Sequence, residues 1–126
     1  MTPMLHASFH CGAVRLEIAR APKTLTACNC SICSRYAALW AYYTRKAVRV
    51  ISKRGALEDY RWNDRDIAFQ RCTTCGCVTH YSDLRDRSEA GRIAVNARMM
   101  EPSAIASVRV RQFDGAKMVR RVDRSR

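Results

Sequence analysis

The sequence predicts a mainly β domain, built from several short antiparallel sheets with little helix. Apolar and polar residues alternate in many short stretches, which is the pattern of half-buried strands. Glycine, proline, asparagine and aspartate recur between these stretches at fairly regular spacing and mark turns. Because short strands separated by regular turn signals are typical of all-β domains, this class accounts for the pattern best.

The first half of the chain supplies strand patterns in close succession. Alternation, or an aromatic and β-branched composition, predicts strands over residues 5–9, 13–20, 24–28, 39–44 and 47–51. Gly12 permits a backbone conformation that other residues resist, so it marks a turn between the first two strands. A short helix is expected over residues 31–38, with Ser31 as its N-cap.

The second half continues in the same way. Residues 57–62 and 67–71 are predicted to form a hairpin around residues 63–66, and further strands are expected over 78–81, 92–97 and 108–113. Residues 83–91 are expected to form a charged loop, and residues 102–106 a brief helix. From Lys117 onward the sequence is strongly basic and is expected to form a loose tail.

Size and composition fit one intracellular domain. The chain has 126 residues, 48% of them hydrophobic, which allows a single modest core. It has no apolar run near the roughly 20 residues that span a bilayer, and its start lacks the charged and apolar regions of a signal peptide. We therefore expect a soluble, cytoplasmic protein without a membrane partner.

The charge is strongly positive. The sequence carries 23 basic and 11 acidic residues and a formal net charge of +12. Such a surface attracts anions, namely nucleic acid, phospholipid or a small acidic substrate. The basic residues are spread along the chain, so many of them are also explained as solvated surface residues.

Seven cysteines favour metal binding over disulfides, because cytosolic thiols stay reduced. Cys28, Cys30 and Cys33 lie within six residues, close enough to meet at one point. Thiolates are preferred ligands of zinc, which takes four ligands at the corners of a tetrahedron. Three protein ligands leave one corner open to water or substrate, which is the mark of a catalytic zinc.

A second cysteine pair has the spacing of a zinc knuckle. Cys72 and Cys75 are separated by two residues and followed by Gly76, which permits the turn that brings the second sulfur round. Cys11 could supply a third ligand or be a small core residue, and Cys77 could be a fourth ligand or fill the core. A redox pair is the other interpretation of this spacing, but no thioredoxin-like pattern surrounds it.

Three blocks of the sequence together resemble the glutathione-dependent formaldehyde-activating enzyme family, which includes centromere protein V. The blocks are residues 10–15 (HCGAVR), 28–33 (CNCSIC) and 72–80 (CTTCGCVTH). Residues 96–98 (NAR) and 113–115 (FDG) also look like the close of many members. The resemblance covers roughly residues 6–115 and leaves residues 116–126 as the basic tail.

The resemblance implies coiled β-sheets around two zinc sites, a β-tent-like fold. It assigns Cys28, Cys30 and Cys33 to a catalytic zinc, and Cys11, Cys72 and Cys75 to a structural one. The first block of the family usually reads Cys-x-Cys-Gly, but here Phe9 stands where the first cysteine is expected. The structural site therefore lacks a ligand or recruits one from His10, His6, Cys77 or water, and the chain would hold one or two zinc ions.

The implied activity is that of a carbon–sulfur lyase, similar to S-(hydroxymethyl)glutathione synthase. A thiol bound to zinc is deprotonated at neutral pH and can attack an aldehyde carbon. Glutathione is anionic, so Arg35 is a candidate for binding it, and Tyr36 is a candidate for the pocket wall. Other candidates are weighed against plain core or surface roles: Trp40, Tyr42 and Tyr43 as pocket walls and His80 as a proton carrier.

Two other interpretations come from different classes of protein. A zinc-stabilised nucleic-acid-binding module would explain the net charge, the arginines of residues 108–113 and the basic tail. A structural protein that has lost its activity would explain Phe9. An open metal site at Cys28, Cys30 and Cys33, the trio, argues against the nucleic-acid-binding module, because a purely structural zinc is normally closed by a fourth protein ligand. Exchange of the fourth ligand of this zinc for added thiol would separate an active site from an inactive structural one.

Overall fold

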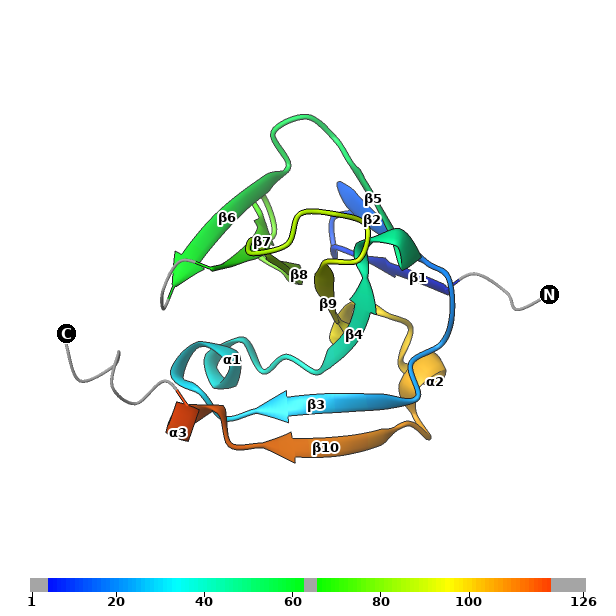
Figure 1. The fold of residues 1–126 in the computed structure, drawn as a ribbon. Coiled ribbons are helices and arrows are strands. Elements are labelled where there is room, and N and C mark those ends of the chain that lie inside the picture. Colours follow the sequence, from blue (N-terminus) through cyan, green and yellow to red (C-terminus); the bar gives the residue numbers. More distant parts are fainter. Residues whose placement is uncertain (1–4, 63–65, 119–126) are drawn as a thin grey trace.

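The computed structural model describes residues 5–62 and 66–118 and is mainly β, which confirms the predicted fold class. These residues form ten strands with short helices between them, arranged as Figure 1 shows. The strands are β1 (Leu5–Ser8), β2 (Val14–Ile18), β3 (Thr24–Cys28), β4 (Trp40–Thr44), β5 (Val48–Ser52), β6 (Leu57–Trp62), β7 (Ile67–Cys72), β8 (Val78–Asp83), β9 (Arg92–Asn96) and β10 (Arg109–Phe113). The α-helices are α1 (Ser31–Tyr36), α2 (Pro102–Ile105) and α3 (Gly115–Met118), and 3-10 turns span Arg45–Ala47 and Ala97–Met99.

The strands form two sheets. The smaller sheet has the order β1-β2-β5, and the larger one has the order β10-β3-β4-β9-β8-β7-β6. All neighbouring strands pair antiparallel except β10 and β3, which are parallel from Arg109 beside Thr24 to Phe113 beside Cys28. The sequence predicted antiparallel sheets, so this parallel edge pair is a correction. It arises because α2 and the chain around it carry the strand back to the edge beside β3 (Figure 1).

Two clusters of buried side chains form the core. The larger cluster lies where the small sheet packs on the large one and includes Phe9, Leu16, Ile18 and Val95. The smaller cluster includes Trp40, Phe69 and Tyr81, and two of the trio cysteines belong to it. Successive side chains of a strand point to opposite faces, so β4 contributes to both clusters.

Two local expectations are corrected by the structure. Helix α1 begins at Ser31, but its N-cap is Cys30, whose side chain accepts a hydrogen bond from the Cys33 amide, so Ser31 is not the cap. The expected basic tail begins with helix α3, and residues 119–126 lie outside the described residues, as do residues 63–65 of the predicted hairpin turn. Within the described part of the chain, no helix is long and apolar enough to cross a membrane.

Candidate metal centres

The trio cysteines meet where β3 ends and α1 begins. Cys28 is the last residue of β3, Cys30 is the N-cap of α1 and Cys33 lies in its first turn. Residues three apart in a helix share a face, which brings Cys33 back over Cys30. The three sulfur atoms all lie within 4.8 Å of one another. Cys30 and Cys33 are buried and Cys28 is half-buried.

This donor set fits a zinc ion. Zinc–sulfur bonds of 2.3 Å in a tetrahedron place neighbouring sulfurs about 3.8 Å apart, which the observed spacing accommodates. Hydrogen bonds from the Cys30 and Cys33 thiols lower the pKa of Cys28 to about 3, and backbone amides of Cys30 and Gly115 act in the same direction. Cys28 is therefore the thiol that ionises first. The indole Nε1–H of Trp40 donates to the Cys33 sulfur at 3.4 Å, as a donor to a thiolate ligand would.

Aromatic rings cover the buried side of the trio. Trp40 and Tyr81 meet edge to face with ring centroids 4.9 Å apart, and Phe69 lies 5.3 Å from Tyr81 and 6.1 Å from Trp40. Tyr36 extends the group from α1, with its ring 5.6 Å from that of Phe69. Apolar walls of this kind lower the local dielectric and keep water from reacting groups.

The second cluster brings together Cys11, Cys72 and Cys75, whose sulfur atoms also lie within 4.8 Å of one another. Cys72 ends β7, and its sulfur accepts hydrogen bonds from the amides of Thr74 at 3.3 Å and Cys75 at 3.2 Å. Gly76 follows with a φ of +79°, the left-handed conformation that the knuckle turn requires. The sulfurs of Cys11 and Cys72 are 3.4 Å apart. This geometry also fits zinc, although only three thiols contribute.

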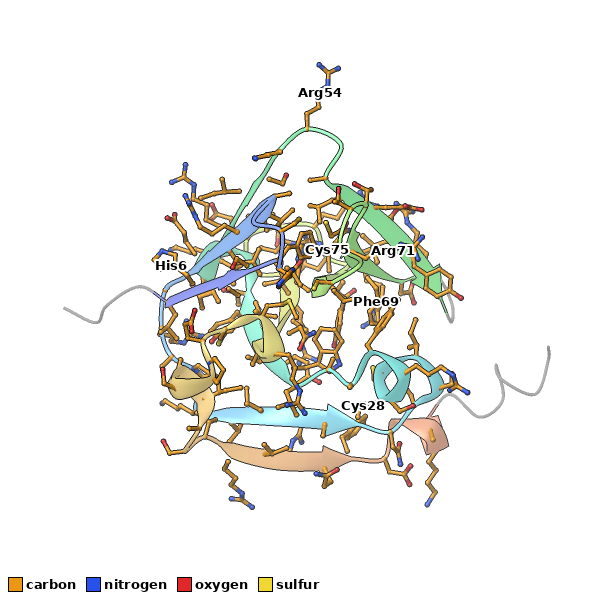
Figure 2. The ribbon with its side chains drawn as sticks, turned by 180° about the vertical axis from the view of Figure 1, so that it is seen from behind. His6, Cys28, Arg54, Phe69, Arg71 and Cys75 are labelled. Atoms are coloured by element: carbon orange, nitrogen blue, oxygen red, sulfur yellow. The ribbon has the colours of Figure 1, made fainter. Side chains whose placement is uncertain are left out.

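The possible fourth ligands of the second cluster do not join it in the described residues. Phe9 is buried in the larger core cluster with 2% of its surface exposed, so the position where the family has a cysteine is filled by a ring. Cys77 stays outside the group of mutually close sulfurs, although its thiol lies near that of Cys75. His10 is exposed, and His6 is exposed on β1 with Nε2 3.9 Å from Glu17. In Figure 2, His6 and Cys75 are labelled on the half of the molecule away from Cys28.

The predicted substrate residues lie at cavities between α1 and the knuckle. Arg35 and Tyr36 line a cavity of about 390 Å³, and Tyr36 also lines a neighbouring cavity of about 450 Å³. Tyr36, Gly76 and Val78 are common to both. The exposed guanidinium of Arg35 donates to the Ser31 carbonyl of its own helix at 2.8 Å.

Sequence reasoning missed two basic residues at these cavities. Arg71 lines the larger cavity and Arg98 the smaller one. Arg71 directly precedes the knuckle, and Arg98 belongs to the NAR stretch near the end of the chain, but neither position alone indicates a role. Arg98 also donates through Nε to the Ala37 carbonyl at the end of α1, at 3.1 Å, and so ties the cavity to the trio helix.

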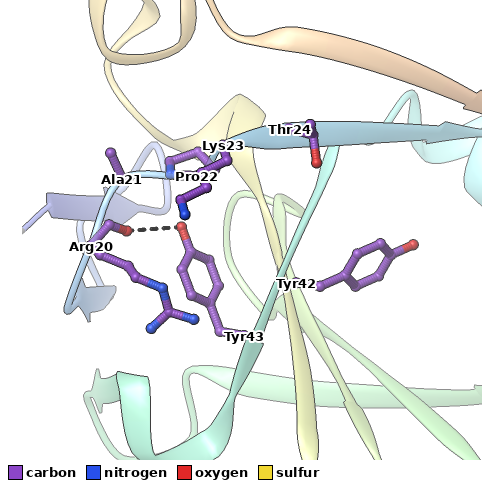
Figure 3. Close-up of a pocket in the computed structure, with 7 residues that line it drawn as sticks. All are labelled: Arg20, Ala21, Pro22, Lys23, Thr24, Tyr42 and Tyr43. Atoms are coloured by element: carbon purple, nitrogen blue, oxygen red, sulfur yellow. Dashed lines mark hydrogen bonds between the residues drawn. The ribbon is translucent and has the colours of Figure 1, made fainter.

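The remaining sequence candidates divide between the two faces of the large sheet. Trp40 and Tyr42 pack with the trio, whereas Tyr43 lies in the other core cluster and is not a wall of the trio site. Figure 3 shows Tyr43 in a cavity of about 270 Å³, with its hydroxyl donating to the Arg20 carbonyl at 3.0 Å. That cavity is lined by Thr24 and so lies at the opposite end of β3 from Cys28.

His80 is fully buried next to Tyr81 on β8. Because neighbouring strand residues point to opposite faces, His80 points away from the face that Tyr81 presents to the trio. Its Nδ1 lies 2.8 Å from the Thr79 hydroxyl, and burial lowers its pKa to about 4. A neutral, buried ring on the opposite face does not support the predicted role as a proton carrier.

Comparison with known proteins places this geometry in a family. Among solved structures, the chain is similar to a crystal structure of a Rhodobacter sphaeroides protein determined as a structural genomics target. The sequences are 27% identical, the match covers 85% of this chain and 100% of the other, and the TM-score is 0.67. The comparison with curated proteins finds no match. Residues 4–113 match the family described as glutathione-dependent formaldehyde-activating enzyme, and the chain therefore belongs to that family.

Proposed function

We propose that this protein is a zinc-dependent carbon–sulfur lyase that makes and breaks adducts between glutathione and formaldehyde or a related aldehyde. The observation that carries the proposal is the trio, in which three thiols within 4.8 Å of one another leave a fourth metal position without a protein ligand in the described chain. Family membership supports a glutathione-dependent, aldehyde-related function.

The trio residues would hold the metal. Cys28, Cys30 and Cys33 supply thiolates, and Trp40 orients Cys33 through its Nε1–H. When bound, zinc would lower the pKa of a thiol that takes its fourth position and so favour the nucleophilic thiolate. The aromatic wall of Trp40, Phe69 and Tyr81 would exclude water from that side.

The chemistry needs no oxidant and no further cofactor. The thiol gives up its proton, its sulfur attacks the aldehyde carbon, and the carbonyl electron pair moves to the oxygen, which takes a proton. The product is a hemithioacetal, in which the former aldehyde carbon carries both the sulfur and a hydroxyl group. The reverse reaction breaks the same carbon–sulfur bond.

We propose that the two cavities between α1 and the knuckle hold the charged ends of glutathione. Arg35, Arg71 and Arg98 lie around them, and guanidinium groups pair well with carboxylates. Burial raises the pKa of Tyr36, so its hydroxyl stays protonated at neutral pH and can donate a hydrogen bond. All seven cysteines are free, which suits a reducing compartment such as the cytoplasm.

The test is exchange NMR with ¹³C-formaldehyde and glutathione, measured with and without the zinc-loaded protein. We expect the protein to accelerate adduct exchange over the uncatalysed rate, and Cys33→Ser to remove the acceleration. Arg71→Ala and Arg98→Ala should raise the glutathione concentration needed for half-maximal exchange. No acceleration at any glutathione concentration, with zinc present at the trio, would rule out this substrate pair.

Nucleic-acid binding is a second candidate function, favoured by strand β10. Every residue of this edge strand is exposed, Arg109 and Arg111 lie on it, and the exposed Phe113 ring lies 5.8 Å from the Arg111 guanidinium. Exposed arginine and aromatic side chains suit single strands. A salt titration with a single-stranded oligonucleotide tests it, because several phosphate contacts require affinity to fall steeply with salt. Affinity that is weak and insensitive to salt would dismiss this candidate.

A further inference from the structure

The last described segment of the chain lies directly against the metal trio. Strand β10 runs parallel to β3, and Phe113 pairs with Cys28, the first cysteine of the trio. The amide of Asn29 donates to the Phe113 carbonyl at 3.2 Å, which continues the pairing into the loop between Cys28 and Cys30. Helix α3 then starts beside the trio, as Figure 1 shows at the ends of β3 and β10.

Asn29 fastens this segment with both ends of its side-chain amide. Its Nδ2 donates to Oδ1 of Asp114 at 3.1 Å, and its Oδ1 accepts from the amide of Ala116 at 2.9 Å. The two bonds lie on either side of Gly115 in the sequence. Because Asn29 stands between two trio cysteines, these bonds link residues 114–116 directly to the cysteine loop.

Gly115 is the point of closest approach. It is buried, and a Cβ added there would lie 2.3 Å from the Cys28 sulfur and 3.4 Å from the Cys30 Cβ. Its φ is not in the left-handed region, unlike that of Gly12, Gly55 and Gly76, so space and not backbone conformation requires glycine here.

We propose that Gly115, secured by the Asn29–Asp114 hydrogen bond, is a positioning residue for the metal at Cys28, Cys30 and Cys33. The bare backbone leaves room for the Cys28 sulfur, and the hydrogen bonds of Asn29 to Asp114 and Ala116 keep that backbone in place. This inference rests on the part of the proposed function that places a metal at the trio, and it does not depend on which substrate is used.

The experiment measures metal affinity at the trio and not turnover. Protein loaded with ¹¹³Cd²⁺ is titrated with a competing chelator and followed by ¹¹³Cd NMR. The trio resonance is identified as the one that Cys33→Ser removes. Groups that support metal ligands typically contribute 10–100-fold to affinity. We expect Gly115→Ala to lower affinity at the trio by about that factor and to shift its resonance, while the resonance of the second cluster is unchanged.

The control is Gly55→Ala. Gly55 lies in a turn with open space around it, so the substitution strains the backbone far along the chain from the trio. It should leave the trio resonance and affinity as in the wild type. A loss in Gly115→Ala equal to that in Gly55→Ala would mean that general destabilisation, and not the contact with Cys28, lowers the affinity.

Two further variants keep the test conclusive if Gly115→Ala does not fold. Asn29→Ala removes both side-chain hydrogen bonds and should weaken metal binding at the trio, whereas Asp114→Asn keeps an oxygen acceptor for Asn29 and should bind almost as the wild type does. Equal affinity in wild type, Asn29→Ala and every folded Gly115 variant would overturn the inference. Failure of the wild type to bind metal at the trio would instead overturn the proposed function.

Discussion

At the scale of single residues, hydrogen bonds orient individual cysteine sulfurs in both clusters. The Cys33 sulfur accepts from the indole of Trp40, the Cys30 sulfur accepts from the Cys33 amide, and the Cys72 sulfur accepts from two amides of its own knuckle. The cysteine spacing alone indicates both clusters. The donor to Cys33 and the close approach of Gly115 to Cys28 could not be predicted, because nothing in the cysteine motif itself states which residues lie over the thiols.

Trp40→Phe tests the indole donor. Phenylalanine keeps an aromatic ring but is smaller than indole, so the buried site gains a small cavity and loses the Nε1–H that donates to Cys33. We expect zinc affinity at the trio to fall about tenfold, the lower end of the effect of such supporting groups. Chelator competition on the zinc-loaded protein measures it.

Tyr43→Phe is the control for the loss of a buried donor on the same strand. It also removes one donor from a buried β4 aromatic side chain, but Tyr43 lies in the other core cluster and donates to Arg20. It should reduce the free energy of unfolding by about 1 kcal/mol and leave zinc affinity at the trio unchanged. Equal zinc affinity in Trp40→Phe and the wild type would show that the indole plays no part in holding the metal.

Phe9→Cys tests the reason for the missing fourth thiol of the second cluster. Phe9 is fully packed in the core, so exchange for a small side chain should lower the stability of the metal-free protein by about 3 kcal/mol. A thiol at this position would complete a closed set of four ligands, and zinc affinity at the second cluster should rise. Urea unfolding without metal and chelator competition with metal measure the two effects. A destabilised variant with no gain in affinity would show that residue 9 does not reach the metal position.

At the scale of elements, alternation predicted most of the strands, because one face of each strand is buried and the other is not. Residues 24–28 were predicted as a strand and form β3 with the same limits. The sequence did not predict which strands pair, because β10 lies beside β3 although the two are 85 residues apart in the chain. The cap of α1 was misassigned because a serine hydroxyl is the usual cap, whereas here the preceding thiol of Cys30 accepts the bond.

His80 on β8 makes a pH-dependent contribution that can be measured. Burial, with a smaller effect of Arg45, lowers the pKa of His80 from 6.5 to about 4. Between these values the unfolded chain binds a proton that the folded protein does not, so stability is complete above pH 6.5 and declines as the pH falls toward 4. At 1.36 kcal/mol per pKa unit, the total decline is about 3 kcal/mol.

The measurement compares urea unfolding of the wild type and His80→Gln at pH 7 and pH 4.5. Acid also releases metal from thiolates in both proteins, so the quantity compared is the difference between them. Most of the decline falls between these two pH values, so the wild type should lose about 2.5 kcal/mol more than the variant on acidification. Parallel losses in the two proteins would contradict a buried, neutral His80.

At the scale of the whole molecule, the two cysteine clusters connect different parts of the fold. The trio lies at the junction of two consecutive elements, the end of β3 in the large sheet and the start of α1. The second cluster joins the turn after β1 to the knuckle after β7, and these strands belong to different sheets. A metal ion there would tie the small sheet to the large one, so we infer that the second cluster serves stability and the trio serves chemistry. The family resemblance implied this division, and the topology supplies a physical reason for it.

Chelation should therefore separate the two roles. For an ion present at 1,000 times its dissociation constant, binding to the folded state alone stabilises by about 4 kcal/mol. Cys11→Ser should lose most of the stability that a chelator removes from the wild type, yet still accelerate glutathione–formaldehyde exchange. Cys33→Ser should show the reverse pattern, and Cys77→Ser, whose thiol stays outside the mutually close group, should behave as the wild type in both assays. Thermal unfolding with and without chelator, paired with exchange NMR, gives both readouts. If chelator destabilises Cys11→Ser as much as the wild type but does not destabilise Cys77→Ser, the structural ligand is Cys77 and not Cys11. If only Cys33→Ser is insensitive to chelator, the metal that stabilises the fold is the one at the trio.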